Sequence, residues 1–165
     1  MGESTKYINL SDEEVFDKYS DTVYRLAFSR TKSKHDADDI LGEVFLRYVK
    51  SNPKFSSEEH VKFWLIRATI NCSKSFLTSS WVKKIVPLED SLYTTMKENS
   101  EVYYAVMKLP VKYRTAVHLY YYEGYSVKEI ADILKASESA VKSRLSRARE
   151  QLKKELEGEM FCVRR

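Results

Sequence analysis

Apolar residues recur along most of the chain at intervals of three and four, which is the spacing of one buried face of an α-helix. In the N-terminal half this pattern predicts helices over residues 12–30, 36–51 and 58–78. A serine with a glutamate three residues later, the capping-box pattern, precedes the first and third helices at Ser11 and Ser56. In the third helix the predicted buried face consists of Val61, Trp64, Leu65, Ala68, Cys72 and Phe76.

Four further helices are predicted in the C-terminal half, over residues 101–108, 111–123, 127–134 and 138–157. Pro110 suits a helix start and Gly124 a helix end. Ser126 and Glu129 form another capping box. Lys135 stands in the turn that follows, where glycine is usual; a positive φ there would cost about 1 kcal/mol relative to glycine.

Residues 87–100 separate the two groups of helices, because Pro87 and a run of polar residues break the apolar pattern. We therefore predict an all-α chain of two small helical domains, residues 1–86 and 101–165, joined by a linker over 87–100. The presence of only 4 glycines and 3 prolines among 165 residues agrees with long helices.

The net charge is concentrated in the C-terminal part of the chain. Residues 1–90 carry 14 basic and 14 acidic side chains, whereas residues 91–165 carry 14 basic and 10 acidic ones, which supplies the whole +4. A basic domain favours a polyanionic partner, although a solvated surface with a small excess of one sign also explains the charge. Apolar runs stay short of 18 residues and the N-terminus is polar, so we expect a cytoplasmic protein without membrane insertion.

The residues that commonly carry catalysis are scattered. Cys72 and Cys162 form no CxxC pair, and His35, His60 and His118 match no metal-ligand spacing. The sequence also lacks a nucleophile–base pair and a glycine-rich phosphate loop. We therefore expect neither an enzyme nor a cofactor, metal or small-molecule substrate.

Residues 126–157 have the organisation of a helix-turn-helix: a short helix, a four-residue turn and a longer basic helix. The longer helix has a predicted buried stripe of Val141, Leu145, Ala148, Leu152 and Leu156. With that stripe inward, short hydroxyls and cations face outward or flank it, as expected of a helix that reads the major groove. The candidate DNA-binding residues are Ser139, Lys142, Ser143, Arg144, Ser146, Arg147 and Arg149. Alternatively, the cations form ion pairs along the helix with Glu138, Glu150 and Glu155.

Two outward faces in the N-terminal half have their own chemistry. The third predicted helix has a cationic, amide-bearing side with no acid after Glu59, and it carries Lys62, Arg67, Asn71 and Lys74. The second has a charged side that includes Asp39 and Glu43 but also the apolar Leu46, which is consistent with a partner contact. A solvated surface is the simpler interpretation of each.

Short stretches in a characteristic order connect these features to a known family. They are residues 36–41 (DADDIL), 43–46 (EVFL), 63–67 (FWLIR) with Asn71, 109–114 (LPVKYR), 123–131 (EGYSVKEIA) and 140–149 (AVKSRLSRAR). In this order and spacing, the chain resembles the extracytoplasmic-function (ECF) sigma factors of bacterial RNA polymerase, from about residue 19 to residue 156.

This resemblance implies a fold and a set of partners. Region 4, the C-terminal domain, would place its recognition helix in the −35 promoter element, with Lys142, Ser143, Ser146 and Arg147 as readers. Region 2 would bind the melted −10 element through Lys62, Arg67, Asn71 and Lys74, and core RNA polymerase through Asp39, Glu43, Leu46 and Arg47. ECF sigma factors commonly have an inhibitory anti-sigma factor as a partner, and that partner is often anchored in the membrane.

A second hypothesis remains open from the sequence. A stand-alone helix-turn-helix repressor with an N-terminal dimerisation or sensing domain would also account for the basic C-terminal helix. Such a protein would need a two-fold symmetric operator. Residues 158–165 carry no pattern that either hypothesis explains.

Overall fold

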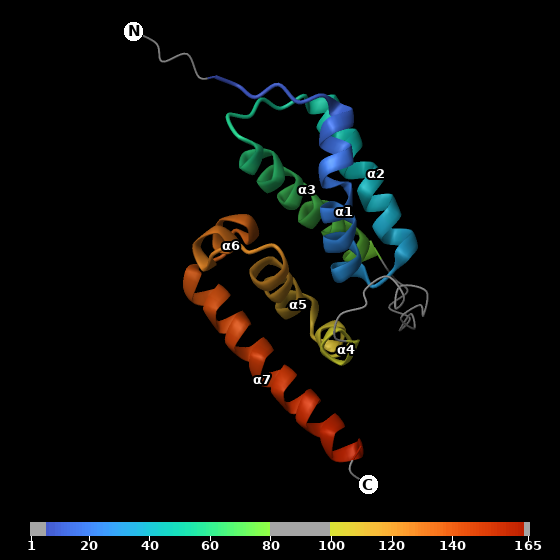
Figure 1. Ribbon diagram of the computed structural model, residues 1–165, viewed down its shortest axis with the longest axis vertical. Helices are drawn as coiled ribbons and strands as arrows, with labels where there is room; N and C mark the ends of the chain where they lie inside the picture. Colours follow the sequence, from blue (N-terminus) through green and yellow to red (C-terminus); the bar gives the residue numbers. More distant parts are fainter. Residues whose placement is uncertain (1–5, 80–99, 164–165) are drawn as a thin grey trace. The chain divides into compact units, whose positions relative to one another are not determined.

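The computed structural model describes residues 6–79 and 100–163, and every regular element within these ranges is a helix (Figure 1). The two ranges belong to two separate compact units. The predicted all-α architecture is therefore confirmed. The predicted linker lies outside the described residues, except for Ser100, which begins a helix.

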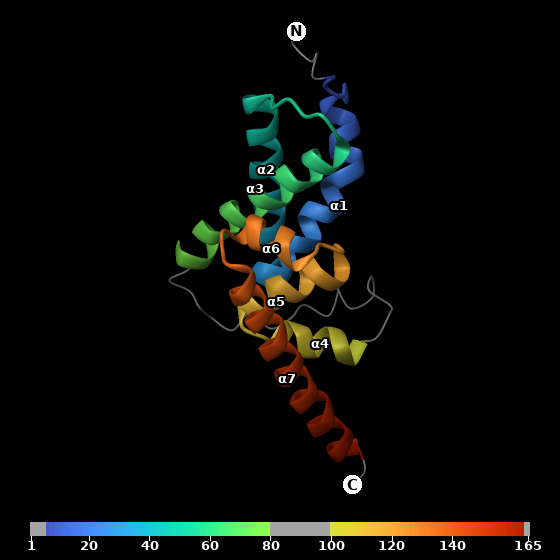
Figure 2. The ribbon, with the colours of Figure 1, turned by 90° about the vertical axis from the view of Figure 1, so that its left-hand side faces the viewer.

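The N-terminal unit contains three helices that pack on one another: α1 (Asp12–Thr31), α2 (Lys34–Ser51) and α3 (Glu58–Ser79) (Figure 2). The predicted capping box opens α1, because Ser11 Oγ accepts from the Glu14 backbone N–H at 3.1 Å and the Glu14 carboxylate accepts from the Ser11 N–H at 2.7 Å. The box predicted at Ser56 is wrong. Since α3 begins at Glu58, Ser57 is the residue that caps it, accepting from the His60 N–H.

The buried side of α3 differs from the predicted stripe. It consists of Val61, Leu65, Ile66, Thr69, Ile70, Cys72 and Ser73. The predicted Trp64, Ala68 and Phe76 are only half-buried. This helix contacts both α1 and α2, so its buried side is wider than a single stripe and is turned away from Trp64.

A buried arginine links α1 to α3. Arg30, 7% exposed, donates from Nε to Ser73 Oγ at 2.5 Å. Burial disfavours the charged form and lowers the pKa of Arg30 to about 10. The guanidinium remains charged at neutral pH, and its hydrogen bond to Ser73 is a polar contact between two mainly apolar helix faces.

The C-terminal unit contains α4 (Ser100–Lys108), α5 (Val111–Val117), the π-helical η2 (His118–Tyr122), α6 (Val127–Leu134) and α7 (Glu138–Val163). The long α7 packs against α4, α5 and α6 (Figure 1). The predicted helix over 111–123 exists, but its last turn is π-helical, which the sequence pattern did not indicate. Gly124 follows it with a φ of +72°, the conformation that glycine adopts most readily.

The helix-turn-helix forms as predicted in most details. The Ser126–Glu129 capping box opens α6, and Lys135 has a φ of 51° at its end. Three residues, one fewer than predicted, separate α6 from α7, and α7 continues to Val163 rather than ending at residue 157. The Ala140 N–H donates to Ser137 Oγ at 3.0 Å, so Ser137 caps α7.

Arg114 secures the end of α4 from inside the C-terminal unit. It is 4% exposed, and its Nη1 donates to the Leu109 carbonyl at 2.6 Å and to the Met107 carbonyl at 3.4 Å. A helix end leaves carbonyls without intrahelical partners, and this guanidinium supplies the donor.

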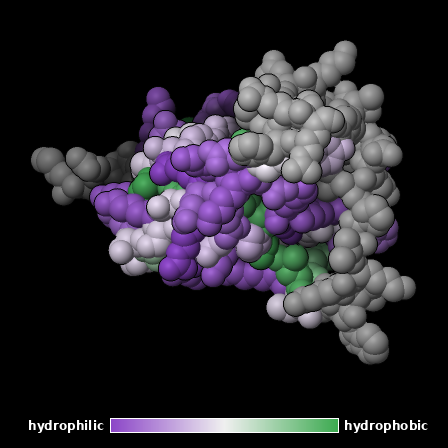
Figure 3. Space-filling model, turned by 90° about the horizontal axis from the view of Figure 1, so that it is seen from below, coloured by the Kyte–Doolittle hydropathy of each residue, from purple (hydrophilic) through white to green (hydrophobic). Residues whose placement is uncertain are grey.

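The face of the molecule in Figure 3 is mainly hydrophilic. Hydrophilic residues cover most of the coloured area in Figure 3, with smaller hydrophobic areas between them. Among the described residues, the helices lack the length and apolar character needed to cross a membrane.

Candidate nucleic-acid interfaces

The predicted recognition surface on α7 is accessible to a ligand. Val141, Leu145 and Ala148 are at most 2% exposed, so the predicted inner stripe is buried there. Arg144 is half-buried at the edge of that stripe. The other candidates are all exposed: Ser139, Lys142, Ser143, Ser146, Arg147 and Arg149. The structure therefore presents short hydroxyls with cations on both flanks.

The described glutamates of α7 do not pair with the cations beside this surface, as the alternative interpretation required. Glu150 pairs with Lys154 at 3.4 Å, and Glu155 pairs with Lys108 of α4. Among the described residues, the salt bridges include none of the four cations that flank the recognition surface: Lys142, Arg144, Arg147 and Arg149. Their charge stays available for an anion.

One of these arginines, Arg149, contacts a tyrosine, which the sequence pattern did not indicate. The Tyr113 side chain of α5 raises the pKa of the exposed Arg147, and Arg147 in turn lowers the pKa of Tyr113. Arg149 Nε donates to the Tyr121 hydroxyl of η2 at 2.8 Å. The only sequence signal was the concentration of tyrosines at positions 120–122.

A pocket of about 480 Å³ opens beside α3 in the N-terminal unit. Its walls are aromatic, cationic and amide side chains: Arg47, Phe55, His60, Phe63, Trp64, Arg67, Ala68 and Asn71. The Arg67 guanidinium lies 5.9 Å from the Phe63 ring centroid, within cation–π range. Arg67 and Asn71 were predicted to share a face, whereas the aromatic walls were not foreseen, because Trp64 was expected to be buried in the core.

Lys62 does not join the other predicted −10 residues. Nine positions separate it from Asn71, which is about two and a half helical turns, so the two leave α3 on opposite sides. Lys62 is half-buried and does not line the pocket. Lys74 is exposed and lies almost one turn beyond Asn71 on the same side.

The predicted polymerase-binding face of α2 is a mixed charged and apolar surface. Leu46 is 49% exposed and Val49, which was not singled out, is 50% exposed. Arg47 Nε donates to Glu43 Oε1 at 2.8 Å, and this bond raises the pKa of Arg47. Asp39 is exposed and Glu43 half-buried. Arg47 also lines the pocket, so the two predicted surfaces adjoin.

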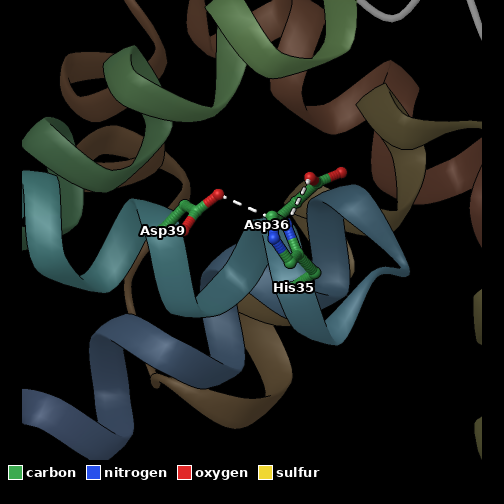
Figure 4. A group of neighbouring side chains, drawn as sticks. All are labelled: His35, Asp36 and Asp39. Atoms are coloured by element: carbon green, nitrogen blue, oxygen red, sulfur yellow. Dashed lines mark ion pairs between the residues drawn. The ribbon is translucent and has the colours of Figure 1, made fainter.

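A histidine and two aspartates gather at the start of α2 (Figure 4). His35 Nδ1 lies 3.3 Å from Asp39 and 3.8 Å from Asp36, and the three donor atoms lie within 4.8 Å of one another. The spacing of the histidines alone does not indicate this group, because Asp39 follows His35 by four residues on the same side of the helix. The His35 side chain is 85% exposed, which keeps these groups hydrated, and we interpret them as surface ion pairs of little energetic weight.

Comparison with known proteins identifies both units. Residues 15–82 match the family model described as Sigma-70 region 2, and residues 100–152 match that of Sigma-70, region 4. The ECF RNA polymerase sigma factor SigM of Bacillus subtilis is 34% identical over 154 residues, covering 86% of this chain and 92% of that protein. The chain belongs to the ECF sigma factors of RNA polymerase.

Further sigma factors support this assignment. SigW of Bacillus subtilis is 27% identical over 180 residues and covers 92% of this chain and 94% of its own length. The solved structure of the Bartonella quintana sigma factor RpoE, in complex with the anti-sigma factor NepR, has a TM-score of 0.67 at 18% identity and covers 88% of this chain and 96% of its own. At that identity the likeness shows a shared fold.

As an ECF sigma factor, the chain binds core RNA polymerase and directs it to promoter DNA. The family, function and partners expected from the resemblance are confirmed, whereas the assignment of single residues stays a prediction. The stand-alone repressor is not favoured, because the residues it would use for dimerisation or sensing match sigma region 2.

Proposed function

We propose that α7 reads the −35 element as a duplex and that the α3 pocket holds bases of the melted −10 element. The observation that carries the proposal is the accessibility of the α7 recognition surface above a buried stripe. Ser143 and Ser146 are short enough to let the helix approach base edges, and Arg147 can reach guanine O6/N7 or a phosphate. Lys142, Arg144 and Arg149 are phosphate contacts on the flanks.

The salt dependence of promoter binding follows from these cations. Each phosphate neutralised on duplex DNA contributes about −0.9 to the slope of log affinity against log salt, so four contacts give roughly −3 to −4. Contacts made by core polymerase add to that slope. The contribution of one side chain to the slope is therefore measured as the difference in slope between the variant and the wild type.

The chemistry of the α3 pocket suits an unstacked base. Aromatic walls offer stacking, worth about 1–3 kcal/mol per base. The Asn71 amide supplies both a donor and an acceptor for a base edge. Arg67, which is half-buried, and Lys74, which is exposed, would hold the phosphate chain. Lys62, on the other side of α3, is assigned to the flanking backbone rather than to the pocket.

We assign core polymerase binding to the face of α2 that carries Asp39, Glu43, Leu46 and Arg47, extended by Val49. The exposed apolar pair would lose water against the polymerase, and the charged residues would orient the contact. Residues 1–86 and 101–165 act as two weak readers joined through residues 87–100. Bound to polymerase at a fixed spacing, they reinforce each other without a new DNA contact.

Three finer features belong to the same proposal. The protein acts in the cytoplasm and supplies no catalysis of its own, since recognition requires only binding. An inhibitory anti-sigma factor controls it, as the solved complex of RpoE with NepR suggests by analogy.

Run-off transcription with purified core polymerase tests the function. Wild-type protein should yield specific transcripts from genomic fragments that core polymerase alone does not transcribe. Arg147→Ala should reduce the strongest transcript at least about fivefold, because a good base contact is worth that much or more in discrimination. Lys153→Ala is the matched control, since its side chain is 75% exposed on the same helix and pairs with Glu157 outside the recognition surface. Equal activity of both variants would refute the placement of Arg147.

A further inference from the structure

Two arginines leave the recognition helix on opposite flanks. Arg147 and Arg149 are two positions apart, which is about 200° around an α-helix. The outward-facing serines lie between these two directions. Arg149 contacts η2 (His118–Tyr122), the helix that continues α5.

The contact at Arg149 combines a hydrogen bond with two ring contacts. Nε donates to the Tyr121 hydroxyl at 2.8 Å, and the guanidinium carbon lies 5.7 Å from the Tyr121 ring centroid and 5.8 Å from that of Tyr120. Tyr121 is 55% exposed, so burial does not force this arrangement. The terminal nitrogens of Arg149 retain four N–H groups, which form the fork that grips a phosphate bidentately.

The π-helical turn contributes to this arrangement. The Glu123 N–H donates to the His118 carbonyl at 3.1 Å, an i to i+5 bond that widens the turn. The wider turn changes the direction in which Tyr120 and Tyr121 leave the rod, compared with an uninterrupted α-helix. In the observed geometry both tyrosines reach the flank that carries Arg149.

We infer that Tyr121 is a positioning residue that holds the guanidinium group of Arg149 on one flank of α7 before DNA arrives. This inference rests on the proposed −35 role of α7. A long side chain loses rotamer freedom when it binds, and a side chain already held loses less. Tyr121 thereby presets one cation for a phosphate on one wall of the major groove.

A tyrosine-to-phenylalanine variant isolates the hydroxyl group. In the complete protein bound to core polymerase, Tyr121→Phe should weaken binding to the promoter fragment that gives the strongest run-off transcript, by about two- to tenfold. The ring, its packing and the Arg149 charge remain. The salt slope should therefore stay at the wild-type value, whereas Arg149→Ala should reduce its magnitude by about 0.9. Tyr122→Phe is the matched control: this neighbour is 53% exposed and stacks on His118 rather than on an arginine.

Double variants separate positioning from general stabilisation. If Tyr121 acts through Arg149, adding Tyr121→Phe to Arg149→Ala should weaken binding no further. A full additional loss in that background, or unchanged affinity in the Tyr121→Phe variant, overturns the inference. If the wild-type holoenzyme gives no specific transcript, the proposed −35 role of α7 is wrong. That outcome is distinct from additive losses of affinity at a promoter that the wild type does transcribe.

Discussion

Removal of the Asn71 amide should impair promoter opening while leaving the protein folded and able to bind polymerase. Asn71 is exposed on α3 and lines the pocket with Arg67 and Phe63. Asn71→Ala takes away one donor and one acceptor without emptying a core position, so the free energy of unfolding should change by less than about 0.5 kcal/mol.

The size of the opening defect follows from the bonds that the amide can make. Two hydrogen bonds to a base edge contribute about 0.5–1.5 kcal/mol each, or about 1–3 kcal/mol together. The equilibrium between closed and open promoter should therefore shift about 5- to 150-fold toward the closed state. Asn71→Asp should show a larger defect, because it also places a negative charge beside the phosphate chain.

Permanganate reactivity of unpaired thymines measures opening directly. It should fall in both Asn71 variants at polymerase concentrations that saturate binding, while co-purification with core polymerase stays at the wild-type level. Gln151→Ala removes an exposed amide from the other unit and should leave reactivity unchanged. Wild-type reactivity in Asn71→Ala would refute the base-binding role of the pocket.

Three changes test the account of the fold by urea denaturation. Lys135→Gly should raise the free energy of unfolding by about 1 kcal/mol because φ there is 51°, and an unchanged midpoint would count against that conformation. Gly42→Ala should raise it by about 0.5–1 kcal/mol, since an added Cβ meets nothing within 4 Å on α2; a loss would reveal an unseen contact. Arg114→Met should lower it by about 2–4 kcal/mol as buried carbonyls lose their donor, and a neutral result would reject that role.

The features that the sequence predicted well depend on neighbouring residues. The capping boxes at Ser11 and Ser126 form because both partners lie within one turn of the same helix. Val141, Leu145 and Ala148 are buried because they recur at intervals of three and four on one side of α7, and the positive φ of Lys135 follows from its position at a helix end. The α7 candidates were therefore found at the surface, as the pattern indicated.

The features that it missed depend on contacts between distant segments. The stripe of α3 was misplaced because the helix packs against two partners, and this error hid the aromatic wall at Trp64. Lys62 was grouped with Asn71 because both are polar, without regard to their angle around the helix. The Arg149–Tyr121 contact spans 28 positions and depends on a π-helical turn, for which the apolar period carries no signal.

Crosslinking from α7 tests the central claim most directly. A photoreactive p-benzoylphenylalanine in place of Ser143, in protein bound to core polymerase on its promoter, should crosslink to the −35 element. The same group at Lys153, farther along the helix, should give little crosslink there. Crosslinks from position 143 confined to polymerase or to DNA outside the −35 element would contradict the account.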